Sequence, residues 1–315
     1  MAERAEKRGV ITAQRWGPRA LALPARSGLP VLRRMAAMPL RDPFAFAGVL
    51  IYLMFIAVAL LADQLAPTDP MEILFTKAGK VAANLPPSAE FPLGTTNLGR
   101  DIYAQLIYGT RSALAVGLSA AIIVATVGTV VGLVSGYFGG TADAILMRIA
   151  DMALSLPFLP FVIVLTGFLG ADTRNIVLAV ALLLWPNSAR VIRSQVLSLR
   201  ERAYVEAARV TGASQWRILF VHIAPNILPL SFVYAAIAIG WAIITEASVN
   251  FLGFGDPTSV SWGMMLQDAF TSQALSRGQY AWFVPPGLCI ILVVVAGFFI
   301  SRGYEEVFMP RLRGR

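Results

Sequence analysis

Long, nearly uncharged apolar stretches constrain this chain more than any other feature of its sequence. A helix needs about 20 apolar residues to cross the hydrocarbon layer of a bilayer. Six stretches in the 315 residues meet or approach that length. They are Phe44–Ala62, Ser112–Phe138, Met152–Gly170, Asn175–Ala189, Leu228–Val249 and Trp282–Ser301. The sequence therefore predicts an all-α integral membrane protein with six transmembrane helices.

The composition agrees with a membrane protein and excludes a soluble one. Only 14% of the residues are charged, whereas a soluble domain has about 25%. The stretch at 175–189 is the shortest and is interrupted by Pro186. The flanking Arg190 and Arg193 can extend their charged ends to the membrane surface, which lets a short stretch still span.

The distribution of basic residues predicts the orientation. Six crossings place both termini on one side, and the segments on that side hold 20 of the 26 Lys and Arg residues. Because basic loops are retained in the cytoplasm, residues 1–43 and 303–315 are predicted to be cytoplasmic tails. The first tail is too long and too rich in proline for a cleavable signal peptide.

Two longer segments, 63–111 and 251–281, are then external. The first contains five prolines and is predicted to be irregular as far as Leu98. Asn97–Asp101 is predicted to lead into a short amphipathic helix at the membrane interface, with Ile102, Leu106 and Ile107 on its apolar side. Neither segment is large enough to form a soluble domain.

Several kinds of site are missing from the sequence. No G-x-x-x-x-G-K-[ST] loop occurs, so the chain is not expected to bind ATP itself. With one cysteine, Cys289, and one histidine, His222, neither an internal disulfide nor a Cys/His metal site is expected. His222 is interpreted as a polar contact at a helix end. We expect no catalytic residue, no bound cofactor and no enzyme activity in this chain.

The basic cytoplasmic loop between the fourth and fifth stretches is the most informative segment. Arg200–Val210 is predicted to be a short helix, with Arg202, Glu206 and Arg209 on one face where ion pairs can form. Gly212 is suited to the left-handed residue that ends a helix. Ser214 can then cap the next helix, which leads into the membrane.

Ala207 and Ala208 leave part of this helix without bulk. Another protein's surface could therefore approach closely, and the helix would act as a lever. The alternative is a solvated amphipathic connector between two spans. The physical properties of these residues favour neither reading.

A resemblance separates the two readings. Glu206-Ala207-Ala208, then Gly212 after three residues, then Ile223-x-Pro225, resemble the cytoplasmic coupling loop of ABC importer permeases, here residues 195–227. Other motifs are similar to the C-type permease of dipeptide, oligopeptide and nickel importers, over roughly residues 40–300. They are Pro92-Leu93-Gly94-Thr95, Leu98-Gly99-Arg100-Asp101, Leu106-Ile107-Tyr108-Gly109, Gly136-Tyr137-x-Gly139-Gly140, Glu246-Ala247-Ser248 and Ser261-Trp262-Gly263.

The resemblance implies a type I ABC importer permease bundle, residues 112–302, in the bacterial inner membrane. Its partners would be a second homologous permease, two ABC ATPase subunits that carry ATP and Mg, and a periplasmic or lipid-anchored substrate-binding protein, with membrane lipid around it and no nucleic acid. The cargo would be di- or oligopeptides or a related small solute. Gly99, Arg100 and Asp101 would form a periplasmic family motif. The residues coupled to the ATPase would be Tyr204, Glu206, Ala207, Ala208, Arg209 and Gly212.

Polar and small residues within the spans have separate interpretations. Glycines recur every four residues at Gly128, Gly132, Gly136 and Gly140, which predicts close helix packing. Arg148 is expected to neutralise one of two nearby aspartates, Asp143 or Asp151.

Costly polar groups within a membrane span usually face a cavity or a partner. The candidates for the transport pathway or for a subunit interface are Asn187, Ser188, Glu246 and Asn250. For Glu246 we favour contact with the sister subunit over contact with the cargo.

Two other classes of function remain as alternatives. A self-contained secondary transporter or channel is the first, although such carriers usually show an internal repeat with broken helices, and none is evident. A membrane enzyme is the second, weakened by the lack of clustered nucleophiles, acids or metal ligands.

Overall fold

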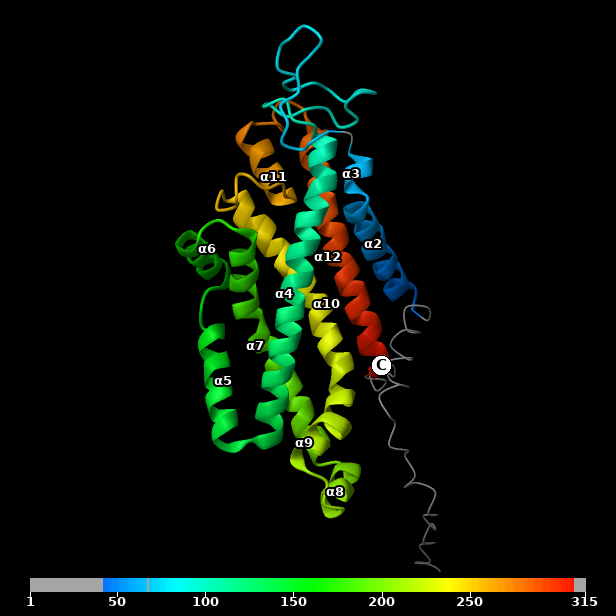
Figure 1. Ribbon diagram of the computed structural model, residues 1–315, viewed down its shortest axis with the longest axis vertical. Coiled ribbons are helices and arrows are strands. Elements are labelled where there is room, and N and C mark those ends of the chain that lie inside the picture. The colour runs from blue at the N-terminus through cyan, green and yellow to red at the C-terminus, as the bar shows by residue number, and fades with distance from the viewer. Residues whose placement is uncertain (1–41, 67, 309–315) are drawn as a thin grey trace, which may run out of the picture.

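The computed structural model describes residues 42–66 and 68–308 as an elongated helical bundle (Figure 1). Five helices in this part are long and apolar enough to cross a membrane, or six if one bent pair counts as a single crossing. Apart from two isolated β-bridges, the described residues contain no strand. The predicted all-α membrane fold is confirmed.

The first predicted span corresponds to α2, Pro43–Leu60. Asp42 caps it, because its carboxylate accepts hydrogen bonds from the first backbone amides, the shorter being 2.7 Å long. A single further turn, α3 (Ala62–Leu65), follows. Asp63 in that turn receives two hydrogen bonds of 2.9 Å from the guanidinium of Arg111. This paired contact fixes the end of α2 against the next helix.

The second span is longer than predicted. α4 runs without a break over 37 residues, Ile102–Phe138. The separate short interfacial helix was therefore a wrong prediction, because its apolar residues form the first turns of α4. Asp101 caps the helix by accepting from Tyr103 N at 2.9 Å. Gly139, with φ +66°, ends it in a conformation that suits glycine.

The third span was predicted as one helix, Met152–Gly170, and this was wrong. α5 (Gly140–Leu154) and α6 (Phe158–Leu169) are bent by 89° at a short break. Pro157 explains the break, because its ring disfavours helical backbone at Leu156 and it lacks an amide hydrogen.

The remaining long helices extend beyond their predicted limits. α7 covers Thr173–Arg200 and continues through Pro186, α10 covers Ala224–Phe251, and α12 covers Tyr280–Phe308. The predicted cytoplasmic tail from residue 303 therefore begins with helix. The rest of that tail, 309–315, lies outside the described residues, as do residues 1–41 of the first one.

Small residues let α4 and α7 approach closely, as predicted. A side-chain carbon added to Gly132 would lie 2.6 Å from Ile192 Cγ2, closer than real carbon atoms come. Gly128 and Gly136 also lie directly against α7. Gly140 is different, since it follows the end of α4 with φ +57° and has nothing within 4 Å. The packing prediction is confirmed for three of the four glycines.

Two ion pairs join α5 to α7, and they do not involve the residue that was predicted. Arg193 donates two hydrogen bonds of 2.5 Å to Asp143. Arg190 pairs with Asp151. Arg148 is exposed and pairs with neither aspartate, so that expectation was wrong. The arginines of α7 compensate both carboxylates because they lie on the face turned to α5.

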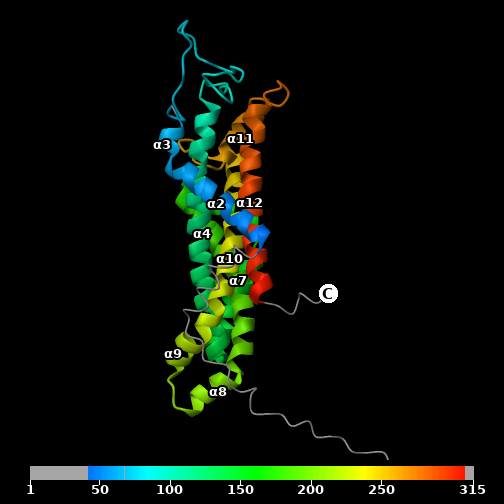
Figure 2. The same ribbon diagram turned by 90° about the vertical axis from the view of Figure 1, so that its right-hand side faces the viewer.

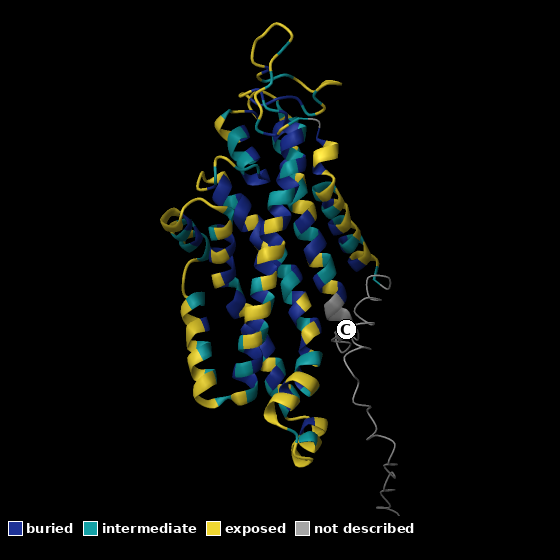
Figure 3. Ribbon diagram, viewed as in Figure 1, coloured by how far each residue is buried: buried dark blue, intermediate teal, exposed yellow. Residues whose placement is uncertain are grey.

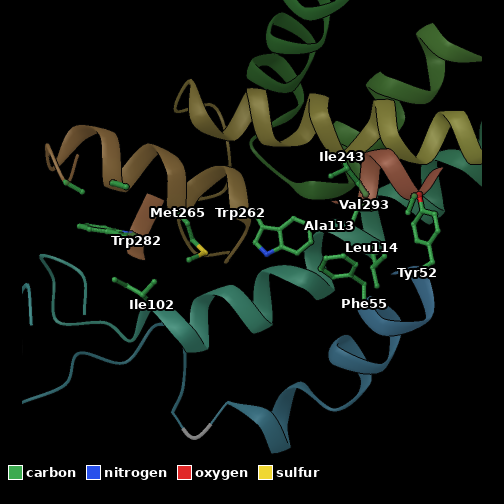
Figure 4. Packing of buried hydrophobic residues seen from close by; sticks show 13 residues of the cluster. Tyr52, Phe55, Ile102, Ala113, Leu114, Ile243, Trp262, Met265, Trp282 and Val293 are labelled. Carbon is green, nitrogen blue, oxygen red and sulfur yellow. The ribbon is translucent and has the colours of Figure 1, made fainter. Parts of the chain in front are cut away.

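A compact apolar cluster holds together the end of the bundle that contains α11, Trp262–Thr271 (Figure 4). At its centre, the Trp262 ring packs edge-on against Phe55 with ring centres 5.5 Å apart. Trp262 Nε1 donates to the carbonyl oxygen of Leu106 at 3.0 Å, and the absence of a side chain at Gly109 makes room for the ring. Trp262 belongs to α11, a helix that the sequence analysis did not predict.

The bundle has two different ends and an apolar outer surface. Figure 2 shows α8 and α9 at one end, and α11 with the irregular chain before α4 at the other. Figure 3 shows buried residues facing the bundle interior and exposed ones facing outward. Among the exposed side chains are Phe168 (86%) and Leu60 (75%). Large apolar side chains at such exposure match a surface covered by lipid or by another subunit.

Candidate functional site

A short helix stands beyond the ends of the long helices. α8, Ala203–Val210, lies at one end of the bundle beside α9, Gln215–Arg217 (Figures 1 and 2). The sequence analysis started this helix at Arg200, which is instead the last residue of α7. The chain turns before α8 because Arg202 has extended backbone angles, φ −78° and ψ 143°.

Gly212 ends α8 as predicted. Its φ of +78° lies in the left-handed region that favours glycine. The amide of Gly212 donates to Arg209 O at 3.1 Å, and the amide of Ala213 donates to Ala208 O at 3.0 Å. These two hydrogen bonds form a Schellman motif, which satisfies carbonyl groups that the end of a helix leaves unpaired. The exit from α8 is therefore sharply defined.

One buried side chain anchors α8 to the bundle. Val205 is fully buried, although its helix neighbours on both sides are exposed. Burial of a valine side chain contributes about 1.5–3 kcal/mol. It packs in a cluster with residues of α4, α7, η2 and α10: Leu133, Ile192, Val196, Ile218, Leu219, Ile223 and Ile227. Movement of α8 is thereby linked to the helices that cross the membrane.

The outer face of α8 carries one small exposed residue and one charged pair. Ala207 is exposed, whereas Ala208 is half-buried against the anchoring cluster. Of the two predicted alanines, only Ala207 thus offers an open surface. Glu206 accepts a hydrogen bond of 2.8 Å from Arg209 Nη1, and both side chains are largely exposed. An exposed pair at this spacing contributes only about 0.3–0.5 kcal/mol, so it orients the two side chains more than it stabilises the helix.

Tyr204 lies at the start of α8 with 42% of its surface exposed. Partial burial raises the pKa of its phenol, and the nearby positive charge of Arg202 acts in the opposite direction. The hydroxyl therefore stays protonated at neutral pH and can donate a hydrogen bond. Arg202 makes no ion pair within the described residues, so the predicted three-residue charged face is reduced to one pair.

The connection from α8 into the membrane is unusual. Ser214 caps α9, as predicted, by accepting from Arg217 N at 3.3 Å. The next six residues, Ile218–Ile223, form a π-helix, η2, which leads directly into α10. Asn226 donates from its side chain to His222 O at 2.7 Å. This π-helix was not predicted from the sequence. Its one signal there is the following Pro225, which cannot donate the next backbone hydrogen bond.

Asn187 and Ser188, which were pathway candidates, have different surroundings. Asn187 lines a cavity of about 360 Å³ between α4, α6, α7 and α10, together with Phe158, Tyr234 and Trp241. Ser188 is buried against the α4 backbone and donates to Trp185 O at 2.9 Å. The amide of Asn187 can contact a molecule in the cavity, whereas Ser188 serves helix packing.

Glu246 and Asn250 lie together near the opposite end of α10. The Asn250 side-chain amide is 2.6 Å from Glu246 Oε1 and 2.7 Å from Ser261 Oγ, and all three residues are buried. The carboxylate of Glu246 thus faces its own chain, where it joins α10 to the start of α11. The favoured contact with a sister subunit stays a prediction. Within residues 42–66 and 68–308, no three metal-ligating side chains gather.

The residues of the predicted periplasmic motif have structural positions near that end. Gly99 has φ +75°, and Asp101 caps α4. Arg100 lines a small recess together with Gln105 and Asp268 of α11. Burial raises the pKa of Asp268, and the charge of Arg100 partly offsets that effect. The motif joins the irregular segment before α4 to α4 and α11.

Comparison with known proteins gives a consistent result. Residues 128–314 match the family described as binding-protein-dependent transport system inner membrane component. Over 275 residues, the chain is 36% identical to the glutathione transport system permease protein GsiD of Pectobacterium atrosepticum, covering 87% of this chain and 89% of that one.

Two further relatives have similar coverage. The oligopeptide transport system permease protein OppC of Bacillus subtilis is 34% identical, over 86% of this chain and 87% of that one. The probable D,D-dipeptide transport system permease protein DdpC of Escherichia coli is also 34% identical, over 87% of this chain and 90% of that one. With its helical membrane bundle and its glycine-closed loop helix, the chain therefore belongs to the family of binding-protein-dependent transport system inner membrane components.

Proposed function

We propose that this chain is the C-type permease of an importer for di- or oligopeptides or a related small solute in the bacterial inner membrane. ATP would be hydrolysed by two partner subunits, and a second homologous permease would complete the pore. An external binding protein would deliver the cargo. Relatives named for peptide and glutathione transport support this cargo class. Because the chain belongs to a family of transport-system components, no observation favours the alternatives of a self-contained carrier or an enzyme.

The observation that carries the proposal is the construction of α8. Its outer face has one small exposed residue, Ala207, beside an oriented Glu206–Arg209 pair. Its inner face has the buried anchor Val205. A partner that grips the outer face can therefore displace the inner cluster. Because that cluster includes residues of η2 and α10, the displacement reaches a helix that lines the cavity around Asn187.

The positive-inside distribution of basic residues supports a cytoplasmic location for α8, where ATP is available. We assign contact with the ATPase to Tyr204, Glu206, Ala207 and Arg209. Gly212 fixes the exit of the helix, and the half-buried Ala208 permits its close packing on the bundle. In the cavity, Asn187 would contact the cargo.

Ala207→Trp tests this assignment. The large ring would block a close partner without disturbing the buried face, so ATP-driven peptide uptake into proteoliposomes should fall at least about tenfold. The matched control is Ala142→Trp, at an exposed alanine near the same end of the bundle. Equal uptake by the two correctly inserted variants would refute the assignment. Uptake driven by an ion gradient through this chain alone would instead support a secondary carrier.

A further inference from the structure

We propose that a recess beside α8 binds the headgroup of an anionic phospholipid from the cytoplasmic leaflet. The inference rests on the orientation proposed above. The recess has a volume of about 390 Å³ and lies between the end of α4 and the loop that contains α8 and α9. Tyr137 and Phe138 line it from α4, and Arg200, Glu201, Arg209 and Gln215 line it from the other segments.

Two guanidinium groups in the recess retain donors for a phosphate. Arg209 uses Nη1 for Glu206, and within the described residues its Nε and Nη2 make no hydrogen bond. Arg200 donates from Nε to Glu201 and from Nη1 to Gly136 O, which leaves its Nη2 free within the same residues. Arginine is well suited to bind phosphate oxygens because its donors form a fixed planar fork.

The surrounding loop carries a surplus of positive charge. Residues 200–217 contain four arginines and two glutamates, which gives a net charge of +2. The glutamates are already paired with Arg200 and Arg209. Arg202 and Arg217 form no ion pair within the described part of the chain. The carboxylates beside the recess are therefore already compensated, and the net positive charge of the loop, from Arg202 and Arg217 outside the recess lining, attracts an anionic headgroup.

A row of aromatic side chains in contact extends from the recess along the protein surface. Phe138 packs edge-on against Trp216 with centres 5.5 Å apart, and Trp216 stacks on Phe220 at 5.9 Å with an angle of 12°. Trp216 and Phe220 are each 59% exposed, and Val221 beside them is 58% exposed. Amphipathic aromatic rings at a membrane boundary favour the headgroup level, with apolar surface turned toward acyl chains.

This combination favours a lipid over a protein segment. Basic pockets between helices on the cytoplasmic side are typical sites for anionic headgroups. The recess also lies where η2 begins, at Ile218, so the apolar side of a bound molecule would continue along Phe220 and Val221 toward the membrane-crossing α10. A soluble partner would meet the outer face of α8, where Ala207 and Val210 are exposed. Arg209 borders both surfaces, because it pairs with Glu206 on that face and also lines the recess.

Native mass spectrometry of the assembled, detergent-solubilised importer tests the proposal. The complex is equilibrated with an equimolar mixture of phosphatidylglycerol and phosphatidylethanolamine, and the ratio of the two retained lipids is measured. We expect an excess of phosphatidylglycerol in the wild type. Arg217→Gln should lower that ratio about fivefold, the effect of removing one basic residue near an anionic surface. Arg200→Gln should do the same.

The matched control is Arg277→Gln, at an exposed arginine in the external segment, which should leave the ratio unchanged. Trp216→Ala should reduce retention of both lipids and keep their ratio. Equal retention of the two lipids by the wild type would overturn the proposal, as would unchanged selectivity in both arginine variants. Preferential retention of phosphatidylglycerol only after the ATPase subunits have been removed from the complex would assign the recess to protein instead. None of these readouts depends on peptide uptake, so failure here leaves the transport proposal to its own test.

Discussion

The anchor of α8 makes a quantitative prediction about Val205→Ala. The substitution removes two buried carbon atoms from a fully buried side chain. Each buried methyl or methylene group contributes about 0.8 kcal/mol, and the cavity left behind adds to the loss. We therefore expect docking of α8 to weaken by about 2 kcal/mol, which is roughly a 30-fold change in its equilibrium constant.

Hydrogen exchange measures this change directly. Where the exchange rate follows the equilibrium for local opening of α8, its amides should exchange roughly 30-fold faster in Val205→Ala than in the wild type. Val210→Ala is the matched control, because Val210 lies in the same helix with 82% of its surface exposed. The two variants share the same change in helix propensity, so their difference reports the buried contact alone.

The functional consequence follows from the same contact. With the anchor weakened, ATP hydrolysis should continue while less peptide is transported for each ATP consumed. Val210→Ala should keep the wild-type ratio. Equal exchange rates in the two variants would contradict the reasoning, because the buried contact would then not hold α8 to the bundle. Faster exchange without any loss of coupling would show that the cluster does not transmit force.

Two further predictions concern packing and pH. Gly128→Val should force α4 and α7 apart, which costs about 1–3 kcal/mol or more of folding stability and lowers the thermal midpoint of the purified protein. Gly167→Val is the control, because Gly167 has open space around it, and it should leave the midpoint unchanged. Equal midpoints in the two variants would refute the close packing. The pKa of the Asp63 carboxyl is lowered, chiefly by its hydrogen bonds from Arg111. The ionised carboxylate therefore stabilises the fold above the pKa of about 3.9 that it has in the unfolded chain, and this stabilisation is lost as pH falls through the lower pKa of the folded protein. Asp63→Asn should remove this acid-dependent loss from a thermal-unfolding series between pH 3 and 6, and an unchanged profile would count against the pairing.

The sequence predicted the features that depend on local chemistry. Apolar length identified α2, α10 and α12, and the glycine at the end of α8 has the left-handed conformation that was expected. Spacing alone identified the face where Gly128, Gly132 and Gly136 meet α7. Each of these follows from one segment and needs no knowledge of its neighbours.

The errors concern residues whose role depends on a distant partner. Asp143 pairs with Arg193 of α7 rather than with the nearer Arg148, because helix packing, not sequence distance, brings charges together. Glu246 accepts a hydrogen bond from Asn250 within its own chain, and its predicted contact with a sister subunit stays a prediction. No local pattern at these positions distinguishes an internal partner from another subunit.

Backbone irregularities were the other source of error. The bend at Pro157 had a recognisable signal, since proline disfavours helical backbone before it. The π-helix Ile218–Ile223 had only the following Pro225 as a signal, because its own composition is that of an ordinary apolar helix. Its wider turns are stabilised by tertiary packing, with Ile218, Leu219 and Ile223 all buried.

Site-specific crosslinking from residue 207 tests the central claim most directly. Cysteine is introduced by Ala207→Cys after replacing the chain's one natural cysteine through Cys289→Ser, and a bifunctional thiol reagent is applied to the assembled importer in native membranes. The outer face of α8 is predicted to form a covalent adduct with the subunit that hydrolyses ATP, and its yield should change between nucleotide-free and ATP-bound states. An adduct with the external binding protein, or none with the ATPase, would contradict the account.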